Sequence, residues 1–122
     1  MNVNVTLSKL EHIIQIEFPE IIMSTKVDLN KLRVNLIDTS FIEIFHSFSL
    51  PDRWAFHWER RHVDGKLYRH DNIPHTQWNT VSSFPWHFHN GGEDAVEYSS
   101  FGSDPVINTR IFLKFVKNTK FS

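Results

Sequence analysis

Residues 54–71 of the chain, WAFHWERRHVDGKLYRHD, contain two strand-like runs on either side of an Asp-Gly pair. In the first run Trp54, Phe56 and Trp58 alternate with other residues, as they do in a strand with one buried face. Asp64-Gly65 is a strong signal for a two-residue type I′ turn, which needs positive φ at both positions. The stretch therefore predicts an antiparallel hairpin that turns at Asp64-Gly65.

The register of this hairpin decides which side chains share a face, because opposing residues in an antiparallel pair project from the same side. Pairing Val63 with Lys66 gives one face a polar set of side chains: His57, Glu59, Arg61, Tyr68, His70 and Asn72. The aromatic residues then form the core face, and three charged residues share that face near its edge: Arg60, Arg69 and Asp71.

The segment between residues 21 and 46 predicts further antiparallel strands. Apolar and polar side chains alternate through it with a period of two, which is typical of half-buried strands. A turn is expected at residues 38–40. Pairing Ile37 with Phe41 across this turn makes one face wholly apolar, whereas a slip by one residue would place Glu43 on it.

Helices are expected at both ends of the chain. Ser8 and Glu11 have capping-box spacing at the start of an apolar helical stripe that Pro19 stops. Asp104-Pro105 suits the N-cap and first position of a second amphipathic helix. Between Asn72 and that helix the chain loses regular period, and loops of such length are usually functional.

The predicted fold is α+β: an antiparallel β-meander of about five strands with an N-terminal and a C-terminal helix packed on it. A chain of 122 residues is most simply a single domain, 1–122. The formal charge of −1 gives no global attraction to nucleic acid or to membranes. The absence of cysteine excludes disulfide and thiolate chemistry, and no run is apolar enough to span a membrane, so a soluble cytoplasmic protein is expected.

Most of the eight histidines lie between Trp54 and Gly92, and they predict a histidine-rich site: His57, His62, His70, His75, His87 and His89. Histidine transfers protons near neutral pH and also binds metals. The first interpretation is metal-free acid–base cleavage of RNA, in which the 2′-hydroxyl is activated by a base and arginine contacts the phosphate. The candidate catalytic residues are His57, His75, His87 and His89, and the candidate substrate-binding residues are Arg61, Tyr68 and Arg69.

The second interpretation is a divalent metal ion held by His75, His87 and His89, since three histidines with an open position suit zinc or iron. On the first interpretation no cofactor is expected. In both, Asp71 and Asn72 shape the site, because their side chains readily close a backbone turn before the Ile73-Pro74 step.

Several short blocks follow one another along the chain: Phe56-His57-Trp58, Asp64-Gly65, Asp71-Asn72, Pro74-His75, Phe84-Pro85, His87 and His89. In these blocks and their order the chain resembles the TumE family of toxins from toxin–antitoxin pairs. Trp86 replaces the first of the family's paired histidines, and residues 77–83 add a polar stretch.

The resemblance implies a small cytoplasmic toxin that a neighbouring antitoxin protein neutralises. An endoribonuclease acting on RNA and a non-catalytic toxin that acts through a protein partner both fit this description. The sequence leaves the molecular target and the oligomeric state open, a homodimer included.

Overall fold

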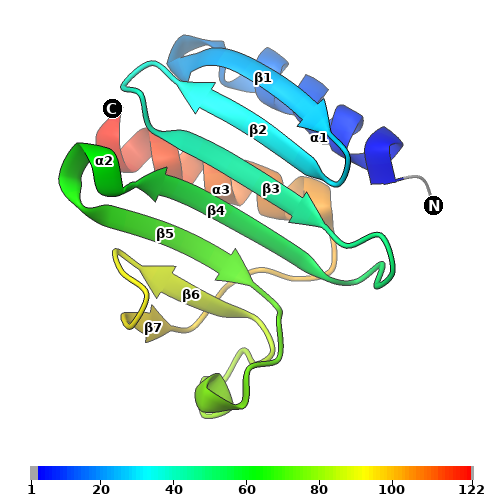
Figure 1. The fold of residues 1–122 in the computed structure, drawn as a ribbon, viewed down its shortest axis with the longest axis vertical. Coiled ribbons are helices and arrows are strands. Elements are labelled where there is room, and N and C mark those ends of the chain that lie inside the picture. Colours follow the sequence, from blue (N-terminus) through cyan, green and yellow to red (C-terminus); the bar gives the residue numbers. More distant parts are fainter. Residues whose placement is uncertain (1–2, 122) are drawn as a thin grey trace.

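A computed structural model describes residues 3–121 as one antiparallel sheet backed by two long helices (Figure 1). The strands follow one another across the sheet in chain order, β1 to β7, so every neighbouring pair is antiparallel. They are β1 Ile22–Asp28, β2 Lys31–Leu36, β3 Phe41–His46, β4 Trp54–Arg60, β5 Lys66–Asp71, β6 His87–Asn90 and β7 Val96–Glu97. The predicted α+β meander is confirmed, with seven strands in place of about five.

The helices are α1 Val3–Glu17, the short α2 Arg61–Asp64 and α3 Pro105–Lys120, with single 3₁₀ turns η1 Pro19–Ile21 and η2 Thr76–Trp78. Figure 1 shows α1 and α3 behind the sheet, on one face of it, while the other face is left open. Apolar side chains from these helices and from alternate strand positions fill the space between, among them Leu10, Ile14, Phe56, Trp58 and Phe112.

Both predicted helices exist, but one boundary was wrong. The first helix already includes Val3, so Ser8 lies inside it and is not its N-cap. The predicted stop before Pro19 is confirmed. At the other end Asp104 caps α3, because its carboxylate accepts hydrogen bonds from the backbone N–H groups of Val106 and Ile107.

The turn between β2 and β3 is longer than predicted, yet the apolar face is preserved. Phe41 pairs with Asn35, two residues before the predicted partner Ile37. The Asp38 carboxylate accepts hydrogen bonds from the backbone N–H and hydroxyl of Ser40, which holds the wider turn. A shift by two residues changes the partners but leaves each side chain on its predicted face.

The hairpin of β4 and β5 departs further from the prediction, because the side chains of β5 lie on the opposite faces from those predicted. Lys66 pairs with Arg60, three residues before the predicted partner Val63. Residues 61–64 form a helical turn that ends at Gly65 with φ 78°, so the connection is not the two-residue turn at Asp64-Gly65. An odd shift moves every β5 side chain to the other side of the sheet relative to β4.

The predicted polar face is therefore wrong in part. His57 pairs with Arg69, whereas His70 pairs with Phe56 on the face that the helices cover. Tyr68 also lies on the covered face, while Arg69 and Asp71 lie on the open one, the reverse of the prediction for each of them. Arg60 was placed correctly on the core side.

The long segment after Asn72 is less irregular than predicted. After η2 it returns to the sheet as β6, which pairs with β5 so that His87 lies opposite Asp71 and His89 opposite Arg69. The two-residue β7 then completes the sheet. Within residues 3–121 no helix is both long and apolar enough to cross a lipid bilayer.

Candidate functional site

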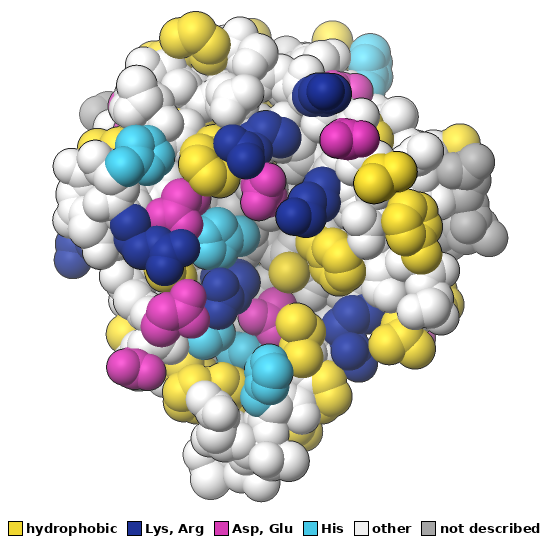
Figure 2. Space-filling view, viewed as in Figure 1, with side chains coloured by type: hydrophobic (Ala, Val, Ile, Leu, Met, Phe, Trp, Pro, Cys, Tyr) yellow, Lys and Arg dark blue, Asp and Glu magenta, His cyan; other side chains and the backbone are white. Residues whose placement is uncertain are grey.

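The open face of the sheet carries the polar side chains of β4, β5 and β6. Figure 2, seen from this side, shows basic, acidic and histidine side chains mixed across the middle of the face. The register brings six of them close together, and we call this group the open-face cluster: His57, Glu59, Arg69, Asp71, His87 and His89.

Glu59 orients His57. Its carboxylate lies 3.0 Å from Nε2 of His57 and accepts two hydrogen bonds from the guanidinium of Arg61, at 2.7 and 2.9 Å. The Arg61 bonds are the main reason that the pKa of Glu59 falls to about 2, so this carboxylate is ionised at neutral pH. An ionised carboxylate at Nε2 favours the tautomer with its proton there, which leaves Nδ1 of His57 as a hydrogen-bond acceptor.

Arg69 lies at the centre of the cluster. Its Nη1 is 3.4 Å from Nδ1 of His57 and its Nη2 is 3.4 Å from Nε2 of His89. Its Nε donates to Asp71 at 3.1 Å, and its Nη2 donates to Glu93 at 3.0 Å. Burial and the Arg69 charge lower the pKa of both His57 and His89, so these imidazoles are neutral at pH 7.

Asp71, His87 and His89 form the buried end of the cluster. One possible ligand atom from each lies within 4.8 Å of the other two, and all three side chains are almost fully buried. Asp71 also closes the predicted turn, because its Oδ1 accepts from the N–H of Ile73. The rings of His87 and His89 pack against Trp78 of η2, which covers them.

A pocket of about 360 Å³ opens beside these residues. Its lining includes Arg69, Asp71, His89 and Glu93 together with His75, whose side chain is exposed. His75, which the sequence suggested as a metal ligand, lines this pocket but is not in the compact group with His87 and His89; Asp71 takes that place.

Two of the polar residues predicted for this surface have structural surroundings instead. His70 is stacked between Phe88 and Phe101, at ring distances of 4.1 and 3.8 Å, and its Nδ1 is 2.7 Å from the hydroxyl of Ser99. Burial lowers the pKa of His70 to about 3. Tyr68 packs between Trp58 and Phe115, away from the open face.

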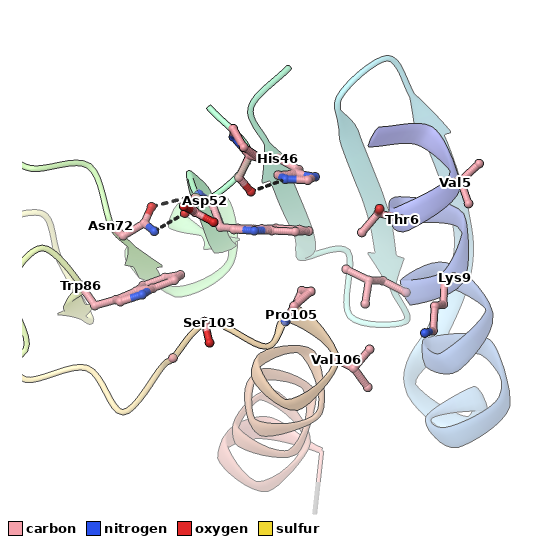
Figure 3. A pocket seen from close by; sticks show the side chains of 14 residues that line it. Val5, Thr6, Lys9, His46, Asp52, Asn72, Trp86, Ser103, Pro105 and Val106 are labelled. Carbon is pink, nitrogen blue, oxygen red and sulfur yellow. Dashed lines mark hydrogen bonds between the residues drawn. The ribbon is translucent and has the colours of Figure 1, made fainter. Parts of the chain in front are cut away.

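Asn72 ties the start of the long segment to the sheet. Its side chain accepts from the N–H of Trp54 and donates to the carbonyl of Asp52 (Figure 3). These bonds lie at the edge of a second, mainly apolar pocket of about 600 Å³, between α1, the start of α3 and the β3–β4 connection. The ring of His46 is stacked on that of Trp54, with ring centroids 3.8 Å apart.

Sequence reasoning missed Glu93, which pairs with Arg69 and whose carbonyl accepts a hydrogen bond from His89. Glu93 follows His89 by four residues, and this spacing is the one local signal for it, because a turn at Asn90-Gly91 lies between them. Asp71 was predicted only to shape the site by closing the turn before Ile73-Pro74, and the predicted register placed its side chain on the other face of the sheet.

No curated protein and no solved structure matches the chain. The family model described as Toxin TumE matches residues 7–120, which include the whole sheet and every member of the open-face cluster. A toxin of this family implies an antitoxin as its partner. The match spans almost the full length of the chain, and the chain therefore belongs to the TumE toxin family.

Proposed function

We propose that this toxin cleaves RNA through the RNA's own 2′-hydroxyl group, with His57 as the proton acceptor. The observation that carries the proposal is the row Glu59–His57–Arg69, with separations of 3.0 and 3.4 Å. A carboxylate that orients a neutral imidazole beside a fixed cation is the arrangement that general-base catalysis on a phosphodiester needs.

Each member of the row has one role in this mechanism. Nδ1 of His57 accepts the proton of the 2′-hydroxyl as its oxygen attacks the phosphorus and the bond to the 5′-oxygen breaks. Glu59 stabilises the imidazolium that forms, as the acid does in a catalytic triad. Arg69, held by Asp71 and Glu93, donates from the Nη1 beside His57 to a phosphate oxygen.

The leaving 5′-oxygen requires a proton, and the proposal assigns its delivery to His75. This side chain is exposed in the lining of the pocket beside Arg69. Arg61 is a further phosphate contact at the other end of the row, where its guanidinium is half exposed. Tyr68 has no role, since it lies on the covered face.

The test is expression of the chain with and without its neighbouring gene, followed by sequencing of RNA ends. The proposal expects new ends bearing 5′-hydroxyl and 2′,3′-cyclic or 3′-phosphate groups when the toxin is expressed alone. Growth arrest without new RNA ends would instead favour a toxin that acts by binding a protein partner.

A further inference from the structure

The buried end of the open-face cluster brings one carboxylate and two imidazoles to a common point. We propose that Asp71, His87 and His89 bind one divalent transition-metal ion of the zinc class. The inference goes beyond the proposed RNA chemistry and does not depend on it. It rests on the protonation pattern of the two rings, on an unpartnered buried nitrogen and on the fit of the distances.

Backbone carbonyls fix the tautomer of both histidines. Nδ1 of His87 lies 2.9 Å from the carbonyl of Pro85, and Nδ1 of His89 lies 2.8 Å from the carbonyl of Glu93. A carbonyl only accepts hydrogen bonds, so each Nδ1 carries a proton. The ring nitrogen left to act as a ligand is therefore Nε2 in both residues, and both Nε2 atoms point toward Asp71. Metal-binding histidines are usually held in this way, by a hydrogen bond from the second ring nitrogen to a carbonyl or carboxylate.

Nε2 of His87 faces Asp71 without a hydrogen bond. It lies 3.2 Å from Oδ1 of the carboxylate, but within residues 3–121 this fully buried atom has no hydrogen-bond partner. Two acceptors this close repel each other unless a positive charge lies between them. A metal ion supplies that charge, and Nε2 of His89, which Nη2 of Arg69 reaches only at 3.4 Å, lies close enough to be a further ligand.

The distances suit a small ion. Zinc binds imidazole nitrogen and carboxylate oxygen at about 2.0–2.2 Å, so two ligands in a tetrahedral site are roughly 3.4 Å apart. The His87–Asp71 pair is already at 3.2 Å, and all three ligand atoms lie within 4.8 Å of one another. Two imidazoles with one carboxylate leave a coordination position free, and Asp71 and His89 also line the adjoining pocket.

Arg69 is the nearby cation that opposes metal binding, and two carboxylates offset its charge. Its Nε donates to Oδ2 of Asp71, which leaves Oδ1 toward His87. Its Nη2 donates to Glu93 at 3.0 Å and also lies 3.4 Å from Nε2 of His89, so it would donate to Glu93 alone when an ion binds that nitrogen. Asp71 would thus be a metal ligand through one oxygen and be oriented by Arg69 through the other, a common second contact for ligating carboxylates.

The ion would join β5 to β6 and hold the segment between them, with Trp78, over the open face. Because Asp71 ends β5 while His87 and His89 lie on β6, the three ligands connect two strands separated by a long stretch of chain. An ion that binds the folded chain and not the unfolded chain stabilises the folded state.

The experiment uses the purified chain after treatment with a chelator and its removal. Calorimetric titration with Zn²⁺, and absorption on titration with Co²⁺, should each show one equivalent bound, and Zn²⁺ should raise the thermal midpoint. Asp71→Asn keeps the side-chain shape and the oxygen that accepts from the N–H of Ile73. It should weaken metal binding more than about 100-fold, which is the upper end of the loss expected for a residue that only hydrogen-bonds a ligand. His87→Gln should do the same.

His12→Ala is the matched control, because His12 is exposed on α1, and it should bind as the wild type does. His75→Ala should also bind within a few-fold, which separates this site from one built on His75. The proposal is overturned if the wild type takes up neither ion at one equivalent, or if Asp71→Asn binds as tightly as the wild type. These readouts need no RNA, so they stand apart from the cleavage test.

Discussion

His70 and His89 lie on neighbouring strands but on opposite faces of the sheet, and their surroundings differ completely. His70 is stacked between two phenylalanines under α3, and burial lowers its pKa to about 3, so the ring is neutral at physiological pH. His89 lies on the open face beside Asp71 and Arg69, with one ring nitrogen bonded to a carbonyl and the other directed into a polar cluster.

The same residue type thus acts as an aromatic core residue on one face and as a reactive group on the other. Alternation along the strands is what separates the two roles. We expect substitutions on the covered face to change stability, whereas substitution of the half-buried His57 on the open face should change toxicity with little loss of stability.

The largest effect on stability is expected for Phe56→Ala on the covered face. Phe56 is fully buried and packs against Phe101 and Phe112, so the cavity should cost about 3–5 kcal/mol of unfolding free energy. Denaturant unfolding measures this cost. Its neighbour His57→Ala should lose less than about 1 kcal/mol, and equal losses for the two variants would break the comparison.

Arg60→Ala is expected to have the next largest effect. The Arg60 side chain is 5% exposed and pairs with Asp38 and Asp64, both about one-quarter exposed. Its loss leaves two carboxylates partly buried, and we expect a cost of about 2 kcal/mol, below the range for a fully buried pair. Arg110→Ala is the control, since it breaks only an exposed pair with Glu17 and should cost far less unfolding free energy than Arg60→Ala.

The third prediction concerns pH. Because the pKa of His70 is about 3 in the folded chain against about 6.5 when unfolded, its contribution to stability is complete above pH 6.5 and declines as the pH falls toward 3. The slope it adds is about 1 kcal/mol per pH unit.

His57 and His89, whose pKa values are also lowered, add to the same decline, so the wild type must be compared with a variant. His70→Phe fits between Phe88 and Phe101 and should give a shallower fall in unfolding free energy between pH 6.5 and 4.5. An unchanged slope would show that His70 is not held neutral.

The smallest change in stability is expected for His75→Ala. His75 is exposed, so its removal should alter the unfolding free energy by less than about 0.5 kcal/mol. Growth arrest on expression should nevertheless be lost. His12→Ala serves as the control that keeps toxicity, and it is better suited than His46→Ala because His46 is buried against Trp54. Undiminished arrest by His75→Ala would remove this residue from the mechanism.

The sequence was sufficient for the fold class, because strand alternation, the Pro19 stop and the Asp104-Pro105 cap are local signals. It failed at the connection between β4 and β5. The ion pair of Arg60 with Asp64 accompanies a helical turn before Gly65, and nothing in the Asp-Gly signal distinguishes this from a two-residue turn.

That error changed the predicted site because the register shift was an odd number of residues. The shift of two residues between β2 and β3 left the faces intact, whereas the shift of three between β4 and β5 exchanged them. The histidines themselves were found from composition, but their grouping with Asp71 and Glu93 depends on β6 pairing with β5. The local sequence pattern does not predict which strands, far apart in the chain, pair with each other.

The role of the 2′-hydroxyl is tested by cleavage of a synthetic RNA with the purified toxin, compared with the same oligonucleotide carrying single 2′-deoxy substitutions. We expect products with 5′-hydroxyl ends, no cleavage next to a 2′-deoxy position, and a rate at least about 100-fold lower for His57→Ala. Cleavage next to a 2′-deoxy position, 5′-phosphate ends, or full activity of His57→Ala would contradict it.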